Sequence, residues 1–218
     1  MTNEEYYQVL PTYVKKLEDS FERSKELGRG VIGENLLLID LCYVSLLDRS
    51  VKLTEGFKQM LQIRNLTCAG ALLRLEMDNS LRLFASYIAQ DENEYANCVM
   101  KGERIDKLRD KNGKQMKDCY LKKQMEQFDK TFCNVYDQSS GYIHFSEKSF
   151  YQSISAGKGY DVLLQITKEP PEKVNTILIA CADAYLHFLN LFHQLMYSAV
   201  DAKQRFDKEY EEKMLNNL

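Results

Sequence analysis

Two acidic residues are the best-placed candidates for chemistry in this sequence. Asp40 falls on the apolar face of a helix predicted to begin near Glu34, and Glu76 falls on the apolar face of the next predicted helix. A buried carboxylate without a partner is costly or stays protonated. We therefore expect at least one of the two acids to be buried and hydrogen-bonded. Two interpretations follow: a buried pair that fixes the packing of the bundle, or an acid–base site.

The partners of these acids should come from the residues that adjacent helices bring within reach, because helices joined by a short connection usually pack together. If the partner is buried, replacing the acid with Ala should destabilise the fold by roughly 3–5 kcal/mol. On the helix that carries Glu76, Arg74, Asp78 and Arg82 form a separate ladder at four-residue spacing. The expected partners of the two acids are Arg64, Arg74, His144, Tyr43 and Tyr87.

A second candidate site is a cluster of basic residues. Nine basic and four acidic residues lie between positions 101 and 123, in a chain whose formal net charge is −3. This local surplus is typical of a face that binds nucleic acid or another anion, although Tyr120 is the only aromatic residue there for base stacking. The alternative is a solvated helix–loop–helix tip. The candidate binding residues are Lys101, Arg104, Lys107, Arg109, Lys111, Lys114 and Lys117.

The sequence gives little support for a metal site or for a catalytic nucleophile. The three histidines are His144, His187 and His193, and none follows a Glu at the spacing found in di-iron bundles. The six cysteines lie at least fourteen residues apart, and glycine-rich phosphate-binding and nucleophile-elbow motifs are missing. We expect no metal, no cofactor and six reduced cysteines. With no apolar signal segment at the N-terminus, we expect a cytoplasmic location.

Two stretches carry a resemblance to a known family: residues 71–78 (ALLRLEMD) and residues 136–146 (YDQSSGYIHFS). They resemble uncharacterised bacterial helical-bundle proteins related to the HEPN superfamily, over about residues 30 to 200 in element order. The resemblance implies a helical bundle, and many members of that superfamily are ribonucleases of toxin, defence and abortive-infection systems. The family's signature, Arg followed after four to six residues by His, does not occur at any of the three histidines.

The elements that must position these residues are mainly helical. The chain has 218 residues with 44% hydrophobic residues, and only three prolines and ten glycines, which disfavours turn-dense β folds. We predict one domain, residues 1–218: a bundle of about six helices with a small β-hairpin near residues 148–168, turning at Gly157-Lys158-Gly159. The cluster Gly28-Arg29-Gly30 and Gly33 should end the first helix, and Thr54 should cap the third. The expected helices cover about 3–27, 34–53, 55–89, a short one ending near 109, 115–137, and a last one opened by Pro171. The stretch 55–89 is long for one helix, and Asn65-Leu66-Thr67 or Gly70 are the candidates for a break in it.

The last helix has the clearest pattern. Its apolar residues alternate at spacings of four and three, and its polar residues form a second stripe on the opposite face. A helix surrounded by lipid would not keep six polar residues on one side, so we expect it to pack into the bundle and not to insert into a membrane. The apolar seam is Val174, Leu178, Cys181, Tyr185, Phe188, Phe192, Leu195 and Ala199, and the polar stripe is Asp183, His187, Asn190, Gln194, Ser198 and Asp201.

Together these patterns predict a non-enzymatic helical bundle that binds a protein or nucleic-acid partner, in a bacterial defence, toxin–antitoxin or mobile-element system. The alternative is a divergent, metal-independent ribonuclease. In it His144 would handle the proton of a ribose hydroxyl while Arg74 stabilised the phosphorane charge, with Glu76 and Asp78 as further candidates. The ribonuclease requires that His144 and Arg74 converge on one cleft. Self-association is left open.

Overall fold

The computed structural model describes residues 1–144, 146–147, 150, 154–156, 162–164 and 166–215. Most of this part of the chain is helical, which confirms the expected mainly α-helical bundle. The helices are α1 (Asn3–Ile32), α2 (Leu38–Gln62), α3 (Leu66–Ile88), α4 (Glu92–Met100), α5 (Asp118–Met125), α6 (Phe132–Ile143) and α8 (Lys173–Leu215), with a short 3-10 turn at Ile105–Lys107.

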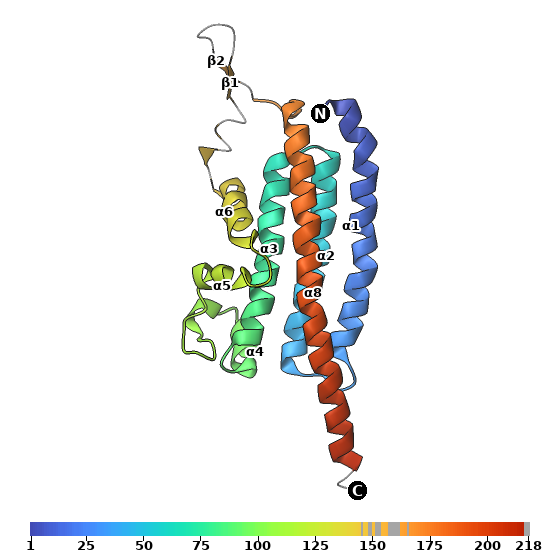
Figure 1. Cartoon of the computed structure of the whole chain (residues 1–218), viewed down its shortest axis with the longest axis vertical. Coiled ribbons are helices and arrows are strands. Elements are labelled where there is room, and N and C mark those ends of the chain that lie inside the picture. Colours follow the sequence, from blue (N-terminus) through green and yellow to red (C-terminus); the bar gives the residue numbers. More distant parts are fainter. Residues whose placement is uncertain (145, 148–149, 151–153, 157–161, 165, 216–218) are drawn as a thin grey trace.

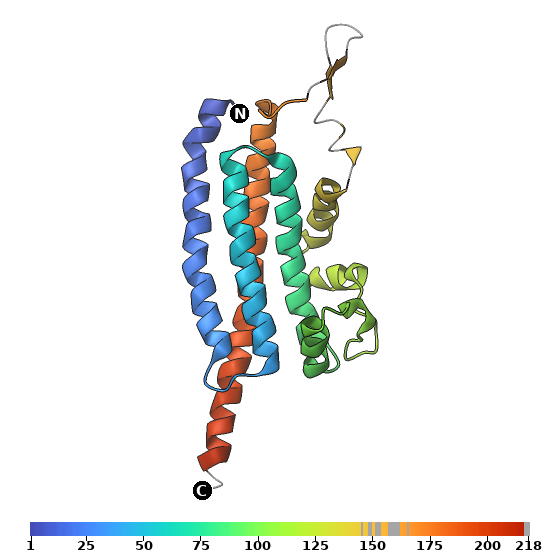
Figure 2. The ribbon, with the colours of Figure 1, turned by 180° about the vertical axis from the view of Figure 1, so that it is seen from behind.

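Four long helices form the body of the molecule. α1, α2, α3 and α8 run side by side, with α8 packed against α1 and α3 (Figure 1). The shorter helices α5 and α6 lie along the outer side of α3, away from α1, and α4 packs against both α2 and α3 (Figure 2). α8 extends beyond the other three long helices at its C-terminal end. The core therefore lies between these four helices, and α8 is longer than the other three.

The predicted seam of α8 is confirmed. All eight of its apolar residues, from Val174 to Ala199, are buried, and all six residues of the polar stripe are exposed. Within the described residues, α8 is the one helix long and apolar enough to cross a membrane, and half of its most apolar stretch is buried inside the bundle. The core helix of a bundle meets the same criterion of length and composition.

Two predicted helix boundaries are wrong because tertiary packing overrides local preference. α1 continues through Gly28 and Gly30 to Ile32, since Gly30 is where Val200 of α8 approaches the helix; a Cβ on Gly30 would lie 2.7 Å from Val200 Cγ1. α1 ends at Gly33, the last glycine of the predicted cluster, whose φ of 54° favours glycine. Thr54 does not cap a helix. It is buried within α2, and its Oγ1 lies 3.1 Å from Tyr185 Oη.

Other boundaries also shift. α2 gives way to α3 at residues 63–65, where Arg64 adopts a φ of 58° and the Asn65 side chain accepts a 3.0 Å hydrogen bond from the Cys68 N–H. The single helix predicted over 115–137 is two helices, α5 and α6, and the helix predicted to end near 109 ends at Met100. The break between α5 and α6 lets both of these short helices lie against α3.

The segment between α6 and α8 contains two strands, β1 (Ile154–Ala156) and β2 (Val162–Leu164), which pair antiparallel with Ile154 opposite Leu164. They lie past the end of the bundle, near the start of α8 (Figure 1). The predicted turn at Gly157-Lys158-Gly159 lies outside the described residues.

Candidate functional site

A pocket of about 620 Å³ lies between α2, the C-terminal half of α3, α4 and the segment that leads into α5. Part of its wall is apolar, formed by Cys42, Leu46, Tyr95, Val99 and Ile105. The remainder carries charge of both signs. Those side chains are Arg49, Arg82, Arg104, Glu103, Asp106 and Asp118. Such a mixed wall suits a ligand that has both an anionic and an apolar part.

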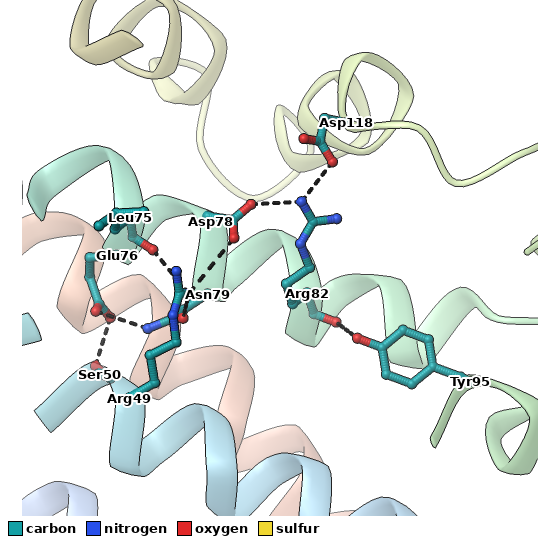
Figure 3. Close-up of polar contacts among 9 residues, drawn as sticks. All are labelled: Arg49, Ser50, Leu75, Glu76, Asp78, Asn79, Arg82, Tyr95 and Asp118. Atoms are coloured by element: carbon teal, nitrogen blue, oxygen red, sulfur yellow. Dashed lines mark hydrogen bonds and ion pairs between the residues drawn. The ribbon is translucent and has the colours of Figure 1, made fainter. Parts of the chain in front are cut away.

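Two of the pocket's arginines are held in place by Asp78, one of the acids singled out from the sequence. Asp78 and Arg82 are one turn apart on α3, so their side chains meet at 2.8 Å. Arg82 also contacts Asp118 of α5 at 2.8 Å, and Arg49 of α2 approaches the second Asp78 oxygen at 3.7 Å (Figure 3). Tyr95 Oη donates to the Arg82 carbonyl at 2.8 Å. Asp78 therefore joins α2 to α3, and Arg82 joins α3 to α4 and α5.

Glu76 lies behind this cluster and is fully buried. Its carboxyl accepts hydrogen bonds from Ser50 Oγ (2.7 Å) and Asn79 Nδ2 (3.1 Å), and the Asn79 carbonyl oxygen accepts one from Arg49 (Figure 3). Burial raises the pKa of Glu76 to about 7. A guanidinium does not release its proton at neutral pH, so this chain of contacts positions Arg49 and does not carry protons to the pocket.

Both acids predicted to be buried are buried, so that expectation is confirmed, but the predicted partners are wrong. Asp40 pairs with Lys203 of α8 at 2.6 Å and accepts the Leu37 N–H at 2.8 Å. No local pattern points to Lys203, because it lies in the charged extension of the last helix, 163 residues away along the chain. Its long apolar stem allows the ammonium group to reach the interior.

The residues predicted as partners make other contacts. Arg64 donates to Asn175 Oδ1 at 2.8 Å and to the Pro170 carbonyl at 3.0 Å, where it fixes the entry to α8. Tyr87 donates to the Leu195 carbonyl at 2.7 Å. These side chains join α8 to the helices around it and do not serve the two acids.

Arg74 and His144 lie at a different place, between α3 and α6. The Arg74 guanidinium stacks 3.3 Å from the centroid of the Tyr136 ring, and its Nε donates to Ser140 Oγ at 3.3 Å. His144 follows the end of α6, where its side chain is exposed and its N–H donates to the Ser140 carbonyl at 3.2 Å. Both residues thus contact Ser140. In the part of the chain that the structure describes, no hydrogen bond joins their side chains, and neither lines the arginine pocket.

A buried serine–histidine pair occurs in the core between α1 and α8. Ser24 Oγ lies 2.9 Å from His193 Nε2, and the two residues are 5% and 1% exposed. Burial lowers the pKa of His193 to about 4, so the imidazole is neutral at pH 7. Among the described residues, Nδ1 has no hydrogen-bond partner. The pair is buried away from any substrate, and in the described residues no carboxylate accepts a hydrogen bond from the histidine. It is therefore a core contact and not a catalytic dyad.

The basic segment, residues 101–117, forms an ordered connection between α4 and α5. The buried carboxylate of Asp110 organises it by accepting the N–H groups of Asn112 (2.9 Å) and Lys114 (2.7 Å) and the hydroxyl of Tyr120 (2.7 Å). All seven candidate cations on the segment are exposed. One of them, Arg104, lines the pocket and pairs with Asp106. The structure therefore joins the basic segment to the cluster around Asp78, a connection that the sequence does not show.

The described residues contain no group of three His, Cys, Asp or Glu side chains placed to hold one metal ion. The donor groups that do converge are guanidinium groups, and their chemistry is the recognition of anions. Comparisons of this chain with family models, with curated proteins and with solved structures find no match.

Proposed function

We propose that this helical bundle is a non-enzymatic protein that binds nucleic acid through the phosphate backbone, using the basic segment and the arginine-lined pocket beside it. The observation that carries the proposal is the arrangement of the seven exposed cations on a connection whose backbone is fixed by buried Asp110. Cations on an ordered backbone lose less entropy on binding than cations on a flexible loop.

The pocket adds sites suited to phosphate. Arg82 is held by the carboxylate of Asp118, whose side chain is nearly half exposed. A phosphate oxygen is the same kind of acceptor as that carboxylate, and a guanidinium binds it through two parallel hydrogen bonds. Asp118 therefore occupies, in the free protein, a position that a phosphate group can take.

Base stacking contributes little to the proposed interface. The hydroxyl of Tyr120, the one aromatic residue predicted for such a role, is bonded to Asp110, and its ring is partly buried. Without an aromatic platform, contacts to phosphate and sugar dominate, so we expect binding that depends strongly on salt and weakly on sequence.

The test is fluorescence anisotropy with labelled duplex and single-stranded RNA and DNA at several salt concentrations. Changing Lys107 and Lys117 to Glu should weaken binding and lower the salt slope for duplex DNA by about 0.9 for each phosphate that the protein no longer neutralises. The control is Lys15→Glu, which changes an exposed lysine of α1; that helix lies on the opposite side of the bundle from α4 and α5 (Figure 1). No binding at low salt, or equal weakening by both changes, contradicts the proposal.

A second proposal is the metal-independent ribonuclease related to the HEPN superfamily. The contact of both Arg74 and the His144 backbone with Ser140 supports it, because it places the two residues on one side of the α3–α6 pair. Purified protein should then degrade total RNA, and His144→Ala should abolish the degradation. Degradation that persists in His144→Ala comes from another source.

A further inference from the structure

Glu76 is connected to the arginine-lined pocket by a short chain of hydrogen bonds. Its carboxyl accepts the side-chain N–H of Asn79 at 3.1 Å, and the carbonyl oxygen of the same amide accepts a hydrogen bond from Arg49 Nη1 (Figure 3). Arg49 lines the pocket, and its side chain is 39% exposed. The amide of a fully buried asparagine therefore lies between a buried acid and a cation that a ligand can reach.

Arg49 has one edge held against α3 and one edge available to a ligand. Its Nη1 also approaches the Leu75 carbonyl (3.5 Å) and Asp78 (3.7 Å), so its contacts with α3 all use the same nitrogen. In the described part of the chain, no residue accepts a hydrogen bond from Nη2 or Nε. A guanidinium binds a phosphate through two parallel hydrogen bonds. The Nη2–Nε edge of Arg49 can supply both of them while Nη1 stays in place.

Arg49 of α2 is also the charged group that faces Glu76 from a neighbouring helix, among the residues that the structure describes. α8 contributes Tyr185, whose pKa is raised by burial, so that its hydroxyl stays neutral. α4 and α5 contact α3 around Arg82, and α6 contacts it around Arg74. The protonation of Glu76 is therefore sensitive above all to the charge balance at Arg49.

The charge at Arg49 and the proton on Glu76 affect each other. Burial raises the pKa of Glu76 to about 7, and the hydrogen bonds from Ser50 and Asn79 and the positive charge of Arg49 oppose that rise. A phosphate bound to Arg49 offsets this positive charge, so it should raise the pKa of Glu76 further. Because coupling between two binding events is reciprocal, protonation of Glu76 increases the affinity of Arg49 for the phosphate by the same factor.

We propose that binding of a phosphate group at Arg49 is coupled to the uptake of a proton by Glu76, so that the protein binds nucleic acid more tightly as pH falls from about 8 to about 6. This inference rests on the proposed function, because the phosphate is that of the bound nucleic acid. Glu76 does not touch the ligand. It is a positioning residue that acts through Asn79 and Arg49.

The first test is the pH dependence of binding to a synthetic DNA duplex without terminal phosphates, because its phosphodiesters do not titrate in this range. At constant ionic strength, the affinity of the wild type should fall by about fivefold between pH 6 and pH 8. Glu76→Gln should lack this fall, because the side chain at position 76 no longer titrates. The exposed His144 and His187 are present in both proteins, so the comparison removes their contribution.

The second test measures the proton directly, by titration calorimetry in buffers of different ionisation enthalpy at about pH 7.5, where free Glu76 is mostly ionised. Wild-type protein should take up a fraction of a proton on binding, and Glu76→Gln should lose that uptake. Arg49→Gln should bind more weakly and also lose it. The matched control is Arg104→Gln in the same pocket, which should bind more weakly but keep the uptake, because Arg104 pairs with Asp106. Circular dichroism checks that each variant is folded.

The coupling and the proposed function fail in different ways. No binding to the duplex at any pH overturns the proposed function together with the coupling. Binding with the same pH dependence and the same proton uptake in wild type and Glu76→Gln overturns the coupling and leaves the proposed function intact. Proton uptake that survives in Arg49→Gln, or that is lost equally in Arg104→Gln, also overturns it, because the effect then does not pass through Arg49.

Discussion

Glu76 shows what a single residue's position on a helix predicts and what it does not. Its place among apolar neighbours predicts burial, which depends only on the helical repeat. One partner, Asn79, lies one turn further along α3, whereas the other, Ser50, comes from α2 and depends on the relative rotation of the two helices. Neutral donors do not compensate a buried charge as fully as a cation does, so the pKa of the carboxyl is raised.

This raised pKa makes stability depend on pH with a definite sign. Between the ordinary pKa of 4.5 and about 7, folded Glu76 holds a proton that the unfolded chain has released. The free energy of unfolding should therefore fall as pH rises through this window, by up to about 1.4 kcal/mol per pH unit, and level off above it. Urea denaturation of wild type and Glu76→Gln across this range measures the effect as a difference between the two proteins.

The comparison with Glu76→Gln is needed because the titration of His193 changes the free energy of unfolding with pH in the opposite direction. Burial lowers its pKa from 6.5 to about 4, so its contribution to stability rises with pH between those values. The two effects partly cancel in the wild type. Glu76→Gln removes only the first and keeps an oxygen for the Ser50 hydroxyl. Parallel stability curves for the two proteins would show that Glu76 is ionised in the fold.

At the scale of elements, the spacing of apolar residues predicted the buried face of α8, whereas the glycine cluster predicted the region in which α1 ends but not which of its glycines ends it. The seam of α8 was predicted because spacings of three and four repeat over seven turns. Gly28 and Gly30 were predicted to stop α1 because glycine is a poor helix former. That penalty of about 1 kcal/mol per glycine is smaller than the free energy gained by burying the neighbouring side chains. The helix therefore continues through Gly30, where α8 packs close to the backbone of α1.

The two glycines should respond oppositely to the same substitution. Gly30→Ala places a methyl group against Val200, 2.7 and 2.9 Å from its two γ-carbons, and should destabilise the fold by about 1–3 kcal/mol. At Gly28, the nearest atom is Leu47 Cδ1 at 3.9 Å, so Gly28→Ala should stabilise by about 0.5–1 kcal/mol through helix propensity. Thermal unfolding of both variants measures this. Destabilisation of equal size in both would mean that α8 does not approach α1 as described.

The molecule as a whole depends on contacts that join its distant ends. Lys203 pairs with Asp40, and Asp207 accepts the Glu34 and Asn35 N–H groups at 3.0 and 3.3 Å, so the C-terminal part of α8 holds the connection between α1 and α2. Local sequence patterns carry no information on contacts between residues so far apart in the chain. The same reason hid the pocket that Arg104 lines together with Arg49 and Arg82.

The arrangement around α8 also leads to a prediction about membranes. α8 has the length and composition of a membrane span, but its seam is covered by α1 and α3 and its exposed face carries Asp183, His187 and four further polar residues. Moving that face into lipid would desolvate six polar side chains and would also require the buried seam to leave its partners. In a flotation assay with phosphatidylcholine vesicles, the folded protein should therefore stay at the bottom of the gradient. Protein heated past its unfolding transition is the control that exposes the seam, and flotation of the folded protein would contradict the prediction.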